Sequence, residues 1–228
     1  MPNWTYNTVR MKNIGNENLY DDEGNFDFNK LIPMPEGLDK TISGGDIMEC
    51  VAYYLLKTNT KAIFWKLMEK YKIHVYSELK KTDTKSELEA KLIRRIYPDT
   101  LRMYNDELYD NNVSKHTPME VGEHYLNLYK KCGYWDWYGW SNANWGTKWN
   151  ACETNKGDDT VCFDTAWCEP EPIWIALSKA FPEREITITA NYEDGLVTDS
   201  VYLNGELTSY REEYETGEEE YETDEEEA

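Results

Sequence analysis

The sequence predicts an α+β fold in which an antiparallel sheet has helices on one face, with a large helical insertion and a disordered acidic C-terminal tail. Short segments in which apolar and polar residues alternate lie near both ends of the chain, and this period is typical of half-buried strands. Between them, apolar residues recur at every third or fourth position, as in amphipathic helices. The final stretch is dominated by Asp and Glu.

The length and composition indicate one packed domain, or one domain with a large insertion. The chain has 228 residues, and 40% of them are hydrophobic, which is enough apolar content for a core. We expect residues 1–39 and 134–205 to form the sheet domain and residues 40–133 to form the helical insertion. Residues 206–228 are expected to form the tail.

The N-terminal part combines one strand with irregular structure. Residues 4–11 alternate and are rich in β-forming types, which predicts the first strand. Residues 13–25 are rich in Gly, Asn and Asp and predict a loop. Residues 26–35 form an extended apolar segment, whose prolines exclude it from a central strand position.

The insertion contains four helical patterns. Apolar residues repeat at helical spacing from Ile47 and again from Ile63. Capping boxes at residues 84–87 and 117–120 begin two further helices. Gly133 can end the last of them in a left-handed conformation.

After the insertion the chain is expected to return to β structure. Residues 150–154 and 160–163 predict a hairpin around a five-residue loop. Residues 170–180 predict a short helix, and residues 186–192 and 196–203 predict two further strands.

The charge is strongly negative and uneven. The chain carries 24 Lys and Arg against 44 Asp and Glu, a net charge of −20. Residues 206–228 hold 12 of the acids and one base, and like charge at this density with little apolar area predicts disorder. We interpret the tail as a solubility segment or as a polyanion that competes for a basic surface on a partner. No direct nucleic-acid partner is expected, because an acidic body cannot supply the counterion release of a basic face.

Several other features are not expected. The sequence has no apolar run long enough to span a bilayer, so no membrane partner is expected. Its N-terminus lacks the basic start and apolar stretch of a secretory signal. The five cysteines show no Cys-x-x-Cys spacing and the three histidines no metal or catalytic spacing, so no metal and no cofactor are predicted. We interpret the cysteines as reduced thiols in a cytoplasm.

Short motifs at both ends of the body point to a known family. The most specific is Asn-Trp-Gly-Thr-Lys-Trp-Asn at residues 144–150. The others are Pro2–Trp4 with Asn7, Phe26–Pro35, Trp137–Tyr138, Phe163–Trp167 with Pro170 and Pro172, Leu177–Ser178 and Phe181–Pro182. On these residues the chain resembles the YubB-like ferredoxin-like domain family of phage and plasmid proteins. Thr5 stands where that family usually has Cys, and Cys168 where it often has Ser.

The resemblance implies a ferredoxin-like sheet and an origin in a mobile element. It implies no activity, and it covers the helical insertion poorly.

The segment 144–150 is the main candidate for a binding site. Lys148 is a lone cation between Trp145 and Trp149, suited to hold a carboxylate or phosphate or to make a cation–π contact. The alternative is a structural corner in which the indoles pack on the sheet, and we favour it because aromatic clusters more often belong to a core. Asp164 and Trp167 could lie beside this segment across the predicted hairpin. The full candidate set is Asn144, Trp145, Lys148, Trp149, Asn150, Asp164 and Trp167.

Residues 134–140 form a second aromatic run. Such runs can stack bases or anchor a protein partner. Because no basic groove accompanies it, a protein interface or a buried core is the better interpretation.

The favoured hypothesis is a non-enzymatic phage or plasmid protein that acts in the host cytoplasm. Such an anti-defence protein would bind and neutralise a host defence or regulatory protein, with an acidic surface that imitates the charge of nucleic acid. The alternative is a small-ligand binder or sponge, in which an anionic, nucleotide-like ligand stacks on Trp145, Trp149 or Trp167 with its phosphate on Lys148. An enzyme acting on such a ligand has the least support, and no catalytic residue is predicted.

Overall fold

The computed structural model describes residues 3–96 and 116–214. The chain divides into two compact units. The sheet unit comprises Met1–Pro33 and Ser141–Ala228, and the helical unit comprises Met34–Trp140. The junctions therefore lie at 33/34 and 140/141, whereas the sequence predicts 39/40 and 133/134.

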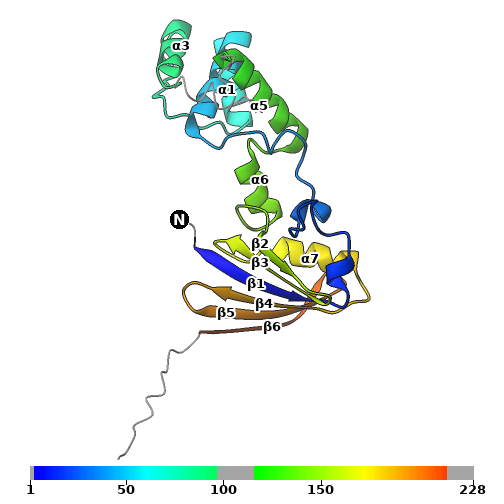
Figure 1. Cartoon of the computed structure of the whole chain (residues 1–228). Coiled ribbons are helices and arrows are strands. Elements are labelled where there is room, and N and C mark those ends of the chain that lie inside the picture. Colours follow the sequence, from blue (N-terminus) through cyan, green and yellow to red (C-terminus); the bar gives the residue numbers. More distant parts are fainter. Residues whose placement is uncertain (1–2, 97–115, 215–228) are drawn as a thin grey trace, which may run out of the picture. The chain divides into compact units, whose positions relative to one another are not determined.

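The sheet unit is built on six antiparallel strands in the order β2-β3-β1-β4-β5-β6 (Figure 1). The strands are β1 (Trp4–Arg10), β2 (Cys152–Lys156), β3 (Thr160–Ala166), β4 (Ile186–Tyr192), β5 (Leu196–Leu203) and β6 (Glu206–Tyr214). Strand β1 pairs antiparallel with both β3 and β4, so these two strands run parallel to each other. Helix α7 (Glu171–Ala180) connects them and makes the split β-α-β unit of a ferredoxin-like sheet. The predicted α+β fold class is confirmed.

The core of this unit lies between the sheet and α7. On β3, Val161 and Phe163 are fully buried, and Cys162 between them faces the opposite side. Helix α7 covers the face that carries Phe163, and its Trp174 ring centroid lies 5.9 Å from that of Phe163. Phe26 from the N-terminal segment stacks on Phe163 at 5.0 Å. One face of the sheet thus has a helix-covered aromatic core.

The segment 26–35 is not extended throughout, as the sequence predicts. Residues Phe28–Lys30 form a short 3-10 helix, η2, because the Asp27 carboxylate accepts a hydrogen bond from the Asn29 backbone N–H. An earlier 3-10 turn, η1 (Ile14–Asn16), lies in the expected loop.

Strand β6 corrects the predicted tail. Residues Glu206–Tyr214 pair with β5 along its whole length, from Leu203↔Glu206 to Leu196↔Tyr214. The expectation that the disordered segment begins at residue 206 is therefore wrong for 206–214, and residues 215–228 lie outside the described residues.

The physical reason is a tight turn followed by favourable cross-strand contacts. Asn204 and Gly205 both have positive φ (51° and 81°), the backbone that a two-residue hairpin turn requires and that Asn-Gly adopts readily. Arg211 then pairs with Asp199 on β5 at 2.8 Å. The high acid content of the segment hides this hairpin signal in the sequence.

Two further elements differ from the expectation. Residues Trp137–Asn144 form helix α6, whereas the sequence predicts a return to β structure after residue 133. The Asp136 side chain accepts a hydrogen bond from the Gly139 N–H in the first turn of this helix, which stabilises its start. The β2–β3 loop is tighter than five residues, because Gly157 N–H donates to the Thr160 carbonyl at 2.8 Å.

The helical unit contains α1 (Gly45–Thr58), α2 (Lys61–Lys70), α3 (Lys85–Ile93) and α5 (Pro118–Cys132). Both predicted capping boxes are present at the starts of α3 and α5, and Gly133 ends α5 in the left-handed conformation at φ 81°. Buried apolar side chains from all four helices form its core, among them Val51, Phe64, Leu88 and Tyr125.

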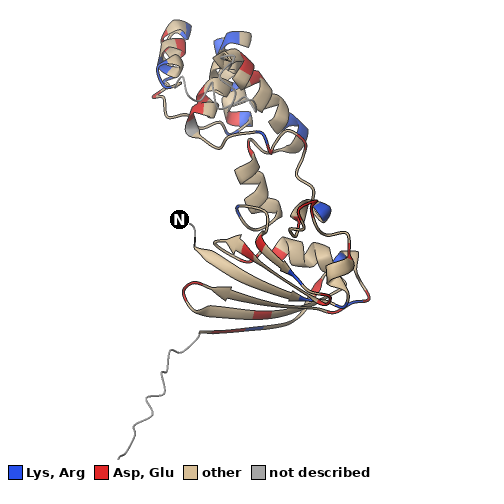
Figure 2. Ribbon diagram, viewed as in Figure 1, with Lys and Arg blue, Asp and Glu red and all other residues tan. Residues whose placement is uncertain are grey.

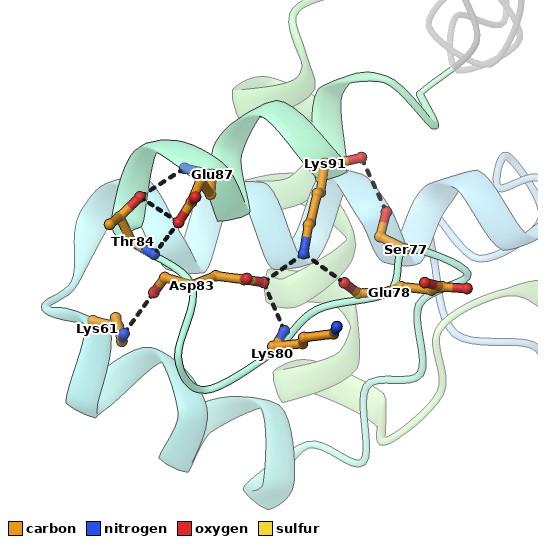
Figure 3. Close-up of polar contacts among 8 residues, drawn as sticks. All are labelled: Lys61, Ser77, Glu78, Lys80, Asp83, Thr84, Glu87 and Lys91. Atoms are coloured by element: carbon orange, nitrogen blue, oxygen red, sulfur yellow. Dashed lines mark hydrogen bonds and ion pairs between the residues drawn. The ribbon is translucent and has the colours of Figure 1, made fainter.

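An ion pair anchors the segment that precedes α3 (Figure 3). The Asp83 carboxylate accepts hydrogen bonds from Lys91 Nζ at 2.7 Å and from the Lys80 N–H at 2.8 Å. Lys91 also donates to the Glu78 carbonyl at 3.0 Å. These contacts hold residues 78–83 against α3 where the backbone has no regular partner.

The buried carboxyl of Glu49 lies in the core of the helical unit. Its Oε1 accepts hydrogen bonds from Ser77 N–H at 2.9 Å and Ser77 Oγ at 3.1 Å, and its Oε2 has no partner among the described residues. Ser77 Oγ also lies 3.1 Å from the Lys91 carbonyl, and a single hydroxyl proton cannot serve both acceptors. Burial raises the pKa of Glu49 more than the Ser77 hydrogen bonds lower it. A protonated Glu49 can donate to Ser77 Oγ, which leaves the serine proton for Lys91.

We expect β6 to contribute to stability. A chain that ends at Asn204 loses β6 and its pairing with β5, so its Tm should fall by several degrees. A chain that ends at Tyr214 keeps β6 and is the matched control, with an unchanged Tm at moderate salt, since the removed residues are dense in like charge. Calorimetric unfolding compares the three chains, and equal Tm values for all of them would contradict a role for β6.

We expect Glu49 to make stability pH-dependent. Because the folded pKa is raised above the ordinary value of 4.5, the stability from this group is full below that pH and is lost as pH rises through the folded pKa. Glu49→Gln should therefore raise Tm relative to the wild type at pH 7 to 8 and leave little difference at pH 4. Glu69→Gln, at an exposed position of α2, is the control with no such trend. A Glu49→Gln Tm below the wild type at every pH would contradict the assignment.

Candidate functional site

The segment 144–150 ties the N-terminal segment to the sheet. Trp145 is buried, and its Nε1 donates to the Ile32 carbonyl at 2.9 Å while its ring meets Phe28 edge-on at 5.7 Å. Thr147 Oγ1 donates to the Ala166 carbonyl at 2.8 Å. These contacts make the segment a structural connector.

Gly146 is required in this connector. Its φ is 79°, in the left-handed region, and a Cβ at this position would lie 2.7 Å from Pro172 Cδ at the start of α7. A side chain here would therefore be strained and would displace the helix.

Asn144 and Asn150 lie at the two ends of the segment. Asn144 is the last residue of α6. Asn150 Oδ1 accepts a hydrogen bond from the Phe28 N–H at 2.9 Å, and its Nδ2 donates to Asp27 at 2.8 Å. Asn150 therefore fixes η2 against the start of β2.

The remaining four candidates are spread over the unit. Lys148 Nζ lies 4.4 Å from the Trp149 ring centroid, and Trp149 contacts Trp4 at 6.0 Å. Asp164 is on the helix-free face of β3, where burial and Glu153 raise its pKa. Trp167 is 55% exposed. The structure thus brings Lys148 and Trp149 together, but it places Trp145 in the core and Trp167 in solvent, and a binding role for the set stays a prediction.

The aromatic run 134–140 contains both packed and exposed side chains. Trp135 stacks on Tyr129 of α5 at 4.1 Å and Trp140 is buried, whereas Tyr138 is 44% exposed. Much of this run belongs to the packing of the chain.

A cavity that the sequence did not predict lies on the helix-covered face of the sheet. It has a volume of about 410 Å³ and lies beside the start of α7, over β4, β5 and β6. Its lining residues combine two carboxylates, three phenols, a serine and a leucine: Glu169, Glu171, Tyr192, Ser200, Tyr202, Leu207 and Tyr210.

Glu169 is the fixed acidic group of this cavity. Its Oε1 accepts hydrogen bonds from Thr198 Oγ1 at 2.9 Å and Tyr192 OH at 3.3 Å, and its Oε2 accepts one from Trp174 Nε1 at 3.0 Å. Three donors from α7, β4 and β5 hold the carboxylate in one orientation. Glu171, the first residue of α7, is exposed and adds a second carboxylate to the cavity lining.

The phenols stay neutral in this surrounding. Burial and the charges of Glu171 and Glu169 raise the pKa of Tyr202 to about 12. Burial and Glu169 also raise the pKa of Tyr192. The rings therefore offer neutral aromatic faces beside two carboxylates, and such faces attract cations.

Ser200 on β5 contributes a buried hydroxyl to the cavity wall. The residue is 2% exposed, lines the cavity, and its Oγ has no hydrogen-bond partner within the described ranges. A buried hydroxyl left unpaired costs about 1–3 kcal/mol. A ligand with N–H donors would satisfy Ser200 Oγ as an acceptor.

Buried polar groups continue beneath α7 from this cavity. Thr5 is paired in register with Tyr192, and its Oγ1 is buried with no partner among the residues that the structure describes. Asn7 Nδ2 donates to Thr165 Oγ1 at 2.9 Å, and its Oδ1 is likewise unpartnered. The covered face thus carries buried polar side chains on β1, β3 and β5 among its apolar ones.

The net charge belongs to the sheet unit. The helical unit contains 16 acidic and 16 basic residues, whereas the sheet unit contains 28 and 8. Within residues 3–33 and 141–214 the sheet unit still has 19 acids against 8 bases. Figure 2 shows both signs interspersed over the helices of the helical unit. Among the residues described, no Lys or Arg lines the cavity.

Part of this site could have been found in the sequence. Alternation on β5 places Ser200 and Tyr202 on the buried face, and Glu169 and Glu171 flank the proline that starts α7. The acid content of residues 206–214 favours a disordered tail, so the sequence does not indicate that Leu207 and Tyr210 belong to a cavity wall.

Two kinds of feature are absent from the described residues. No group of three or more His, Cys, Asp or Glu side chains there is placed to hold a metal ion. None of the described helices combines the length and hydropathy needed to cross a membrane.

One comparison with known families supports the fold of the C-terminal part of the sheet unit. Residues 144–228 match a family model described as the ferredoxin-like domain in Api92-like protein. The chain is also similar to the crystal structure of the protein Api92 from Yersinia pseudotuberculosis, at 11% identity and a TM-score of 0.41, over 93% of this chain and 98% of that one. No curated protein matches the chain. The C-terminal part of the sheet unit is thus similar to an Api92-like ferredoxin-like domain.

We expect Trp145 and Trp149 to differ in their effect on stability. Trp145→Ala removes a buried indole and its hydrogen bond to Ile32, which should lower the free energy of unfolding by about 3–5 kcal/mol. Trp149→Ala, at a half-buried position 6.0 Å from Trp4, is the matched substitution and should cost clearly less. Urea unfolding of both variants measures the difference. A Trp145→Ala variant as stable as the wild type would contradict the connector role.

Proposed function

We propose that this protein is a non-enzymatic binding protein whose sheet unit captures a basic segment of a partner protein, with one cationic side chain in the cavity beside α7. The observation that carries the proposal is the cavity itself. Two carboxylates and three phenols line it without any Lys or Arg among the described residues, and Ser200 offers a buried, unpartnered oxygen.

An arginine fits this lining best. A guanidinium is planar, stacks on aromatic faces, and carries five N–H donors that pair with carboxylates and hydroxyls. Glu169 and Glu171 supply the negative charge, and Tyr202 and Tyr210 supply the rings. A lysine ammonium meets the same charge but has no plane to stack, so we expect it to bind more weakly.

The charge of the sheet unit supports a basic protein as the source of that side chain. A unit whose described residues include 19 acids against 8 bases attracts a positive partner over a Debye length of about 8 Å, which speeds encounter. The same charge repels the phosphates of nucleic acid. Proteins that bind nucleic acid carry basic surfaces, so a host protein of that kind is a fitting target for an acidic competitor.

The finer identity of the protein rests on sequence resemblance. We propose a YubB-like protein of a phage or plasmid, acting in the host cytoplasm on a host defence or regulatory protein. The motif Asn144–Asn150 and the segment Phe26–Pro35 support this origin. The role as a nucleotide-like ligand binder is less favoured, because Trp145 is occupied with Ile32 and Phe28 in the core.

The test is the binding of an arginine-containing peptide, measured by calorimetry, against the same peptide with citrulline in place of arginine. Citrulline keeps the shape and loses the charge, so we expect at least tenfold weaker binding. Glu171→Gln and Tyr210→Ala, both at exposed positions of the lining, should weaken the arginine peptide by a similar factor. Glu183→Gln, an exposed acid outside the cavity, is the matched control and should have little effect.

Two outcomes would contradict this function. Equal affinity for the arginine and citrulline peptides would show that charge is not recognised. An equal loss in Glu171→Gln and Glu183→Gln would show a diffuse attraction with no site. A host protein captured by the wild type should also be displaced by the arginine peptide.

A further inference from the structure

The sheet of this protein ends in a long, accessible strand. Strand β6 is last in the sheet order, and within the described part of the chain no strand pairs with its outer side. All nine of its residues are exposed. The other edge, β2, has five residues and an irregular register with β3. Strand β6 therefore presents the longer row of backbone N–H and C=O groups to a partner.

The cavity adjoins this same edge. Leu207 and Tyr210 of β6 line it, and their side chains are 48% and 52% exposed. A chain paired with β6 would lie about 4.8 Å away, the ordinary strand spacing. A long side chain on its helix-covered face can cross that distance and enter the cavity over Leu207 and Tyr210.

The negative charge of β6 favours a basic segment as the added strand. Strand β6 carries Glu206, Glu212 and Glu213. Its single base, Arg211, is engaged by Asp199 at 2.8 Å and by Glu213 at 3.5 Å. Two copies of this edge would repel each other, so a second copy of the chain is a poor occupant, whereas a basic strand is attracted.

We propose that β6 receives an extended basic segment of the partner as a seventh strand, which delivers an arginine into the cavity lined by Glu169, Glu171 and Tyr202. This inference rests on the proposed function and adds the geometry of capture: backbone pairing supplies affinity, and the cavity selects the cationic side chain. The partner is then a protein with an extended or unfolded segment in which arginines alternate with uncharged β-forming residues.

The experiment uses the full chain and a synthetic peptide with arginines at alternate positions. Alternate N–H groups of a strand point to opposite sides, so only one alternating set faces β6. Two N-methylated peptides are compared, one blocked at the odd positions and one at the even positions. We expect one of them to lose at least tenfold in affinity and the other to bind like the unmodified peptide. The amides of β6 should also exchange more slowly with solvent in the complex.

The outcomes separate this inference from the proposed function. If both N-methylated peptides bind as tightly as the parent and the β6 amides exchange unchanged, strand addition is overturned while arginine recognition stands. If the two N-methylated peptides lose affinity equally, pairing of the peptide with β6 through one alternating set of amides is also overturned. If the parent arginine peptide binds no better than its citrulline counterpart, the proposed function itself fails.

Discussion

The carboxylate of Glu169 is the contact on which both the packing of α7 and the chemistry of the cavity depend. It accepts hydrogen bonds from Trp174 on the helix, Tyr192 on β4 and Thr198 on β5. A carboxylate held by three donors cannot reorient without breaking several hydrogen bonds. The same group that fixes the helix to the sheet therefore places a carboxylate in a fixed position at the cavity.

The unit that contains Glu169 also carries the net negative charge of the chain. The helical unit is balanced, with 16 acids and 16 bases, so the whole excess of negative charge resides with the sheet unit. Its core already tolerates polar groups without partners, such as Thr5 Oγ1 and Asn7 Oδ1. Such groups cost stability, and at Ser200 the cost coincides with an open cavity, where a ligand can offset it.

The sequence predicted most of the secondary structure because its local signals agree with the fold. Alternation on β1, β4 and β5 and the capping boxes of α3 and α5 are all local features that the structure retains. The failure at β6 has a specific cause: the Asn204-Gly205 turn is a strong hairpin signal, but the acid content of the following segment suggested disorder. The sequence does not predict helix α6, because a short aromatic run is equally compatible with a strand.

The cavity could not be predicted from sequence motifs. The most specific motif contains Trp145, Gly146 and Asn150, whose contacts are those of a connector between Ile32, Pro172 and Phe28. The cavity instead draws its walls from residues 169 to 210, none of which forms a recognisable motif. Only the pairing of β5 with β6 and the position of α7 bring them together, and such long-range pairing is not visible in local periodicity.

The most direct test of the account is the NMR spectrum of an isotope-labelled arginine peptide bound to the full protein. An arginine side chain between tyrosine rings should show upfield-shifted δ-protons and contacts to the ring protons of Tyr202 and Tyr210. A bound peptide whose arginine protons keep their free shifts, or contact residues away from this cavity, would contradict the account.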